Sequence, residues 1–307
     1  MKKNQFFSLP YFLIIILIFI TSCTDDDDQQ IINDPPTIEN IEIGSGNSGK
    51  ATIGRDFHFN AHITAGQKID VVTVEIAPKN GVTYAKEWKK SIDWTEFKGQ
   101  RNATVHKHFT IPDDAPEGTF DFIVTVKDEN GTLKQEKVDI MLYKAENLPI
   151  DPKIALLLYR NQTDILYVGE NYTNPEDKVY RKGDLFEGMI GVSRIKGDGE
   201  MVIFLIHKDH QHLPESIDQL DRSKAIIYGI HKHNNFIETQ NLVNSHSNGM
   251  INSFRIGETL NDFNQPSDLI AADKSWKSGE YYLGVLYHNS TYQIHLYKYI
   301  DFKLDLE

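Results

Sequence analysis

Apolar and polar residues alternate in short runs between Thr37 and Tyr143, and turn residues separate the runs. This period of two is typical of half-buried strands. The predicted strands are TIENIEI (37–43), DFHFNAHIT (56–64), DVVTVEIAP (70–78), ATVHKHFTI (103–111), GTFDFIVTV (118–126) and TLKQEKVDIML (132–142). Asn130-Gly131 joins the last two and favours a tight hairpin turn. Six short strands without a long helical pattern predict an antiparallel β-sandwich of the immunoglobulin-like kind.

The second half of the chain repeats this plan after about 150 residues. Segments 183–195, 200–206 and 278–304 correspond in order and hairpin position to strands of the first half. The pattern therefore predicts an all-β protein with two tandem immunoglobulin-like β-sandwich modules, at 37–143 and 154–307. A linker with two prolines, 144–153, joins them, and the second module carries a long insertion that the first does not match.

The N-terminus has the pattern of a secretory signal. Lys2 and Lys3 precede an apolar run of ten residues, YFLIIILIFI, which ends at the small residues before Cys23. The run is too short to span a membrane and fits the apolar region of a signal peptide at 1–22. Cys23 is the only cysteine, so no disulfide can form within the chain. This arrangement resembles a bacterial lipobox, which implies that Cys23 carries fatty acyl chains such as palmitate.

Four aspartates, Asp25 to Asp28, follow Cys23 and lead to Pro35-Pro36. A like-charged block beside two prolines cannot bury enough apolar surface to fold, so 23–36 is expected to be an acidic, flexible tether. The block also resembles the acidic export signal of Bacteroidota surface lipoproteins. That resemblance implies an outer-membrane, lipid-anchored protein exposed at the cell surface. The alternative is a simple spacer.

The charge of the chain limits its partners. The formal net charge is −12, and it becomes −14 once Lys2 and Lys3 leave with the signal peptide. Such an acidic surface argues against binding to nucleic acid. The expected partners are the membrane, through the N-terminal lipid, and an outer-membrane protein or glycan.

Two pairs of histidines lie on predicted strands of the first module. His58 and His62 alternate with Phe57 and Phe59, and His106 and His108 alternate with apolar residues in the same way. If the two strands are neighbours in one sheet, all four imidazoles stand on its outer face. Such a group can bind a divalent transition metal. The alternative is four solvated histidines.

A second group of histidines lies in the segment LIHKDHQHLPES. His207, His210 and His212 fall within six positions, and His231 and His233 follow in the same insertion. Imidazole ligands without cysteine favour Zn²⁺ or another divalent transition metal, such as Cu²⁺ or Ni²⁺. The alternative is a polar loop whose charge changes with pH.

The first module resembles a known family. The segments DFHFNAHI, VTVEIAP and HKHFTIPDDAPEGTFDFIVTVKDENG, together with Trp88 or Trp94, are similar to Bacteroidota lipoproteins with immunoglobulin-like domains of unknown function and histidine-rich strands. The family commonly has histidines where this chain has Ala77 and Asp121. The second module is similar only loosely, with His207 at the first of these places.

The chain contains no G-x-S-x-G, no H-E-x-x-H and no cysteine nucleophile, so no enzyme is expected. The sequence thus favours a non-catalytic surface lipoprotein that binds a divalent metal. A second interpretation is an adhesion or glycan-binding module that uses Trp88 and Trp94 in the loop 79–102, with incidental histidines. A third, weaker interpretation is a metal-dependent hydrolase at the His207 cluster.

Overall fold

The computed structural model describes residues 34–161, 164–168, 171–174, 179–244, 253–261 and 268–307. The segment expected as a signal peptide, Cys23 and the four aspartates lie outside these residues. The described chain is all-β, as the sequence predicts, and its helical elements are single 3₁₀ turns. Among the residues described, no helix has the length and apolar character needed to cross a membrane.

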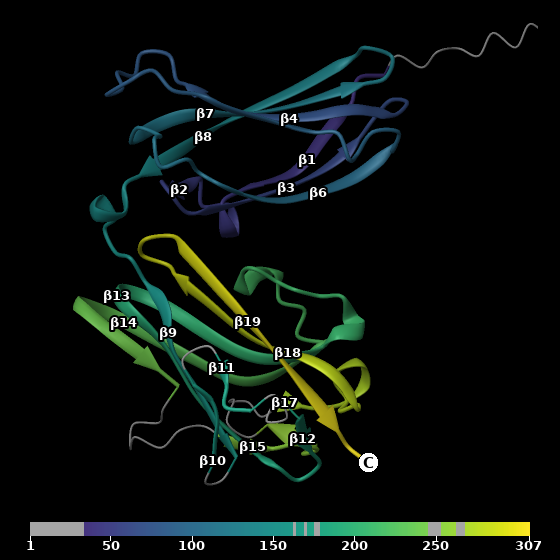
Figure 1. Cartoon of the computed structure of the whole chain (residues 1–307), viewed down its shortest axis with the longest axis vertical. Coiled ribbons are helices and arrows are strands. Elements are labelled where there is room, and N and C mark those ends of the chain that lie inside the picture. The colour runs from purple at the N-terminus through teal and green to yellow at the C-terminus, as the bar shows by residue number, and fades with distance from the viewer. Residues whose placement is uncertain (1–33, 162–163, 169–170, 175–178, 245–252, 262–267) are drawn as a thin grey trace, which may run out of the picture. The chain divides into compact units, whose positions relative to one another are not determined.

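Two sheets form the first half of the molecule (Figure 1). One has the strand order β1-β3-β6 and the other β2-β8-β7-β4-β5. The strands are β1 (Thr37–Ile43), β2 (Lys50–Thr52), β3 (Asp56–Thr64), β4 (Ile69–Pro78), β5 (Lys90–Trp94), β6 (Asn102–Thr110), β7 (Gly118–Asp128) and β8 (Leu133–Tyr143). The six strands expected from alternation all form, within two residues at each end. β2 and β5 are too short to produce a period-two signal.

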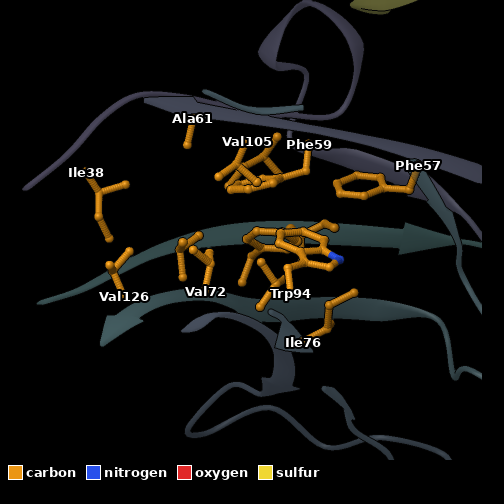
Figure 2. Close-up of a cluster of buried hydrophobic side chains, with 14 of the residues drawn as sticks. Ile38, Phe57, Phe59, Ala61, Val72, Ile76, Trp94, Val105 and Val126 are labelled. Atoms are coloured by element: carbon orange, nitrogen blue, oxygen red, sulfur yellow. The ribbon is translucent and has the colours of Figure 1, made fainter. Parts of the chain in front are cut away.

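A core of buried hydrophobic side chains fills the space between the two sheets (Figure 2). Phe57 and Phe59 of β3 point inward to meet Val72 and Val126 of the opposite sheet. Because side chains alternate across a strand, this inward row forces the histidines between the phenylalanines onto the other face. Packing of the core therefore determines the direction of the polar row.

The hairpin between β7 and β8 contains the expected Asn130-Gly131 pair. Gly131 has φ of 90°, a conformation that a Cβ atom disfavours, whereas Asn130 stays at negative φ. The Asn130 side chain instead accepts hydrogen bonds from the backbone and hydroxyl of Thr132. One residue of the pair, not both, supplies the positive φ.

The second half is organised around one large sheet with the order β11-β10-β9-β13-β18-β19-β12, on which β14 and β15 pair with β13. A further pair, β16 and β17, stands apart. The strands are β9 (Lys153–Asn161), β10 (Asp164–Val168), β11 (Asn171–Tyr172), β12 (Val179–Arg181), β13 (Leu185–His207), β14 (Ala225–Val243), β15 (Ser253–Arg255), β16 (Leu260–Asn261), β17 (Asp268–Leu269), β18 (Gly279–Asn289) and β19 (Ile294–Asp305). The 3₁₀ turns are η1 (Ser45–Asn47), η2 (Ala145–Asn147), η4 (Lys208–His210), η5 (Ile217–Gln219) and η6 (Ala272–Lys274).

Strand β13 differs from the sequence prediction. The segments 183–195 and 200–206, expected as two strands, form one strand that pairs with β9 over its first half and with β18 over its second. Register shifts and positive φ at Arg194 and Gly197 mark the place where its partners change. The inserted segment contributes β14, which pairs with β13 as an antiparallel ribbon. The loop between β13 and β14 includes residues 208–224.

Candidate metal centre

Three histidines converge from two adjacent strands of the first half. In the β3–β6 register His58 lies directly opposite His108, and Asn60 lies opposite His106. Directly opposite side chains stand on the same face of a sheet, ~4.5–5.5 Å apart at Cβ. The rings of His58 and His108 have centroids 5.2 Å apart, and those of His106 and His108 are 5.4 Å apart. Strand pairing therefore brings these three imidazoles together.

Glu215, from the loop between β13 and β14, completes the group. Its Oε1 lies 3.1 Å from His106 Nε2 and 3.0 Å from His108 Nε2. Its Oε2 lies 2.6 Å from His58 Nδ1. One ligand atom from each of the four residues lies within 4.8 Å of every other, a grouping that can hold a metal ion.

The separations are those of a small coordination shell. His106 Nε2 and His108 Nε2 are 3.3 Å apart, and His58 Nδ1 is 3.5 Å from His108 Nε2. Ligand atoms at ~2.0–2.1 Å from a tetrahedral ion stand about 3.3 Å from one another. The distances from the imidazole nitrogens to the Glu215 oxygens, 2.6 to 3.1 Å, also suit hydrogen bonds from imidazole N–H groups to the carboxylate. The arrangement thus fits either an ion or, without one, a carboxylate surrounded by imidazoles.

The loop holds Glu215 firmly in place. The Glu215 backbone N–H donates to Gln219 Oε1 at 2.9 Å, and the Tyr299 hydroxyl donates to the Pro214 carbonyl at 2.5 Å. Glu215 is 7% exposed. No metal-ligand spacing singles out this residue in the sequence. Its only signal is that it lies near the end of the histidine-rich stretch LIHKDHQHLPES, three residues after His212.

Further carboxylates contact the outer nitrogens of two of the histidines. His108 Nδ1 lies 2.6 Å from Asp56 Oδ2, and His58 Nε2 lies 3.5 Å from Glu42 Oε2. Gln219 donates to the same Glu42 oxygen at 2.9 Å. Metal-binding histidines usually donate their second N–H to such a partner, which fixes the tautomer and the ring orientation. Asp56 and Glu42 therefore stand where partners of metal ligands are found.

The electrostatics of the group favour a charged pair. Burial opposes protonation of His58, but its contacts with Glu215 and Glu42 prevail and raise its pKa to about 9. Burial likewise opposes ionisation of Glu215, yet its contacts with His58 and His108 lower its pKa to about 2. At neutral pH the metal-free group thus holds an ionised Glu215 beside a doubly protonated, positively charged His58. A metal ion that binds His58 must displace one of its two ring protons.

His62 lies on the same outer face but apart from this group. Its partners in register are Glu39 of β1 and Thr104 of β6, so no imidazole stands opposite it. His62 Nδ1 instead contacts Asn40 Nδ2 at 3.2 Å. The fourth histidine of the sequence hypothesis is therefore replaced by Glu215.

His207 ends β13, His210 and His212 lie in the loop after it, and the three do not form a metal-binding group. The His207 Nδ1 accepts a hydrogen bond from the backbone N–H two residues later, at 3.2 Å. His210 Nε2 bonds to the Asp273 carbonyl at 2.9 Å, and His212 Nε2 accepts from the Asp221 N–H at 3.0 Å. Each imidazole thus forms a hydrogen bond through one ring nitrogen with a different backbone group, because the chain turns between the three histidines. None of the three belongs to the four-residue group.

His231 and His233 lie on β14. His233 is 3% exposed and contacts the Gly197 carbonyl and the Tyr287 hydroxyl, both at 3.0 Å. His231 lies opposite Met201 in the β13–β14 register. These two histidines therefore belong to the packing of the second half, and the insertion does not bring them to the loop histidines.

The two tryptophans pack against the core of the first half. Trp94 ends β5, is 8% exposed and stacks on Phe59 with ring centroids 5.6 Å apart. Trp88 packs edge-on against Phe120, and its N–H donates to Asp114 at 3.3 Å. The segment 79–102 thus contains a strand rather than one long loop, and Trp94 has no free face for a sugar ring.

Comparisons with known proteins find one family model that matches part of the chain. The family described as "Domain of unknown function (DUF4625)" matches residues 21–143, which include His58, His106 and His108 but not Glu215. No curated protein matches the chain.

Among solved structures, dimeric latent PorU from Porphyromonas gingivalis is similar over 92% of this chain, with 12% identity and a TM-score of 0.33. The match covers 21% of the PorU chain, so this chain spans about a fifth of that protein. The sporulation control protein Spo0M from Bacillus subtilis matches 65% of this chain and 90% of its own, with 12% identity and a TM-score of 0.26. These similarities carry no functional argument.

Proposed function

We propose that this chain is a lipid-anchored surface protein that binds one divalent transition metal ion at His58, His106, His108 and Glu215, without catalysing a reaction. The observation that supports this proposal is the convergence of three imidazole nitrogens and one carboxylate oxygen within 4.8 Å. Two of the imidazoles also have carboxylates at their outer nitrogens, as ligands of a metal usually do.

The ligand set supports a borderline ion rather than a hard or a soft one. Three imidazoles and one carboxylate suit Zn²⁺, Cu²⁺ or Ni²⁺, whereas Ca²⁺ prefers an all-oxygen shell and Cu⁺ prefers sulfur. The side chains of His106 and His108 are 49% and 30% exposed. An ion bound there would be open to solvent on one side and could exchange with chelators, which suits capture and release at a surface.

Metal analysis of the full-length protein after dialysis tests the proposal. The parent should retain about one Zn²⁺ per chain, because the four side chains supply one tetrahedral ligand set. His106→Ala/His108→Ala should retain none, because two of the four ligands are gone. His62→Ala is the matched control, since it removes an imidazole from the same face without touching the group. Equal metal content in all three proteins would reject the site.

Anchoring is supported by the single cysteine behind the apolar run. Cys23→Ser should abolish acylation and release the protein from membranes. Replacing Asp25 to Asp28 with asparagine should leave the protein lipidated but protected from external protease. A Ser variant that still sediments with membranes would contradict the lipoprotein proposal, and unchanged protease access would reduce the aspartates to a spacer.

A further inference from the structure

A cavity of about 440 Å³ lies beside the metal centre and shares His58 and Asp56 with it. This volume is in the range of ~300–1,000 Å³ that is usual for small-molecule sites. The walls come from segments distant in sequence, namely 44–58, the linker region 143–152, and 292–297, which is the turn before β19 and the start of that strand. Much of the lining is apolar or aromatic, including Phe57, Tyr143, Leu148, Ile150, Ile294 and Leu296.

The charged part of the lining consists of two bases, Lys50 and Arg55, and two acids, Asp56 and Asp151. Lys50 lines the cavity, and its ammonium donates to the neutral Tyr292 carbonyl at 2.7 Å. Among the residues that the structure describes, no carboxylate lies within ion-pair distance of this ammonium, so its charge is not neutralised locally. In a protein with a formal net charge of −12, an uncompensated cation in an apolar cavity is a feature that selects for anions.

A second group of cations stands at the linker end of the cavity. Arg55 forms two hydrogen bonds with Asp151, at 2.6 and 3.1 Å. Lys153 and Arg194 approach the same carboxylate at 3.7 and 3.8 Å. One carboxylate thus faces three cations. The remaining acid of the lining, Asp56, lies 2.6 Å from His108.

We propose that this cavity binds a small organic anion, whose apolar body packs against the aromatic and aliphatic walls and whose charged group lies at Lys50. The uncompensated ammonium favours a ligand with a negative charge. The apolar walls favour an organic anion with a hydrocarbon body over an inorganic anion. Binding here does not require the metal, because Lys50, Arg55 and the apolar walls lie outside the four ligands, of which only His58 lines the cavity.

Titration of the full-length protein with naphthylacetate tests this site, with the neutral naphthylacetamide as a matched probe of the same shape. The acid should bind saturably and more tightly than the amide. Lys50→Met keeps the methylenes and removes the charge. It should weaken binding of the acid about tenfold, the ratio expected for loss of one charge-assisted contact, and leave binding of the amide unchanged. Lys134→Met, at a distant exposed ion pair, is the control.

Two more variants keep the test decisive. Leu148→Trp fills the cavity from a half-buried position and should abolish binding of both probes. Lys153→Met lies on the surface and should weaken only the acid, by a smaller factor. The inference fails if naphthylacetate does not saturate, or if its affinity survives both Lys50→Met and Leu148→Trp. Binding that persists in His106→Ala/His108→Ala would separate this site from the metal centre.

Discussion

Two histidine-rich regions of the same chain have opposite outcomes. On β3 and β6 three of the four histidines converge around Glu215, whereas His207, His210 and His212 each bond to a different backbone group. In the loop the histidines are closer in sequence, but on the strands they are held in register by a ladder of hydrogen bonds. A ladder fixes the distance between side chains far apart in sequence, and a turning loop does not. Density of histidine along a sequence is thus a weaker sign of a site than alternation on paired strands.

The largest expected difference between the two regions is in stabilisation by metal. Zn²⁺ at a hundredfold excess over its dissociation constant should stabilise the parent by ~2.7 kcal/mol. His106→Ala/His108→Ala should lose this increment, and His207→Ala/His210→Ala should retain it. Thermal melts with and without Zn²⁺ measure both. Loss of the increment in the loop variant alone would reverse the comparison.

The outer carboxylates should matter in the strand region only. Asp56→Asn removes the charged partner of His108 and should weaken Zn²⁺ binding by ~10–100-fold. Asp273→Asn is the matched change for the loop, where His210 bonds to the backbone carbonyl and not to the side chain. It should leave Zn²⁺ affinity unchanged. Competition with a chromogenic chelator gives both affinities, and equal values for the two variants would remove the positioning role of Asp56.

The strand region should also respond to pH. His58 has its pKa raised to about 9, so metal must displace its proton at neutral pH, and Zn²⁺ affinity should rise about tenfold per pH unit until about 9. The metal-free protein should show the opposite trend. Because protonated His58 is favoured in the folded protein, its contribution to the free energy of unfolding is fully present below the unfolded pKa of ~6.5. This contribution is lost as the pH rises through about 9. Titrations and melts between these limits check both directions, and a pH-independent affinity would show that His58 is not a ligand.

The smallest effects are expected from histidines outside the four-residue group. His62→Ala removes an exposed side chain and should change the free energy of unfolding by less than about 0.5 kcal/mol. His210→Ala deletes one hydrogen bond to a backbone carbonyl and should cost about 1 kcal/mol. Denaturant melts without metal distinguish them. A larger loss for His62→Ala would mean that its contact with Asn40 holds the β1–β3 edge.

Alternation located the strands of the first half because its sheets have one buried and one polar face. β3 shows this most clearly, since its phenylalanines face the core and its histidines do not. The method failed on β13, which is one strand of 23 residues with bulges where two were expected. Its last seven residues are all buried, so their pattern has no period. Local sequence cannot tell where such a strand changes partners.

The same limit explains the centre itself. Three of its four residues lie on strands whose faces the sequence reveals. Glu215 is separated from His108 by 107 positions and lies in a loop, where no periodicity predicts a direction. Conversely, His62 has the right face and the wrong neighbour, because Thr104 stands opposite it. The face of the sheet on which a side chain lies follows from the sequence of its own strand, but the side chains beside it depend on the fold of the whole chain.

The division of the four candidate ligands between strands and loop has a thermodynamic consequence. The histidines stand on the sheet that covers one hydrophobic core, and Glu215 stands on a loop beside another. An ion held by all four would act as a reversible crosslink between the two cores, and would close a loop between His108 and Glu215, which are 107 positions apart. Calorimetry should then show the cores melting together when Zn²⁺ is bound. Glu215→Ala, which leaves three imidazoles on one sheet, should let them melt as two transitions even in excess Zn²⁺.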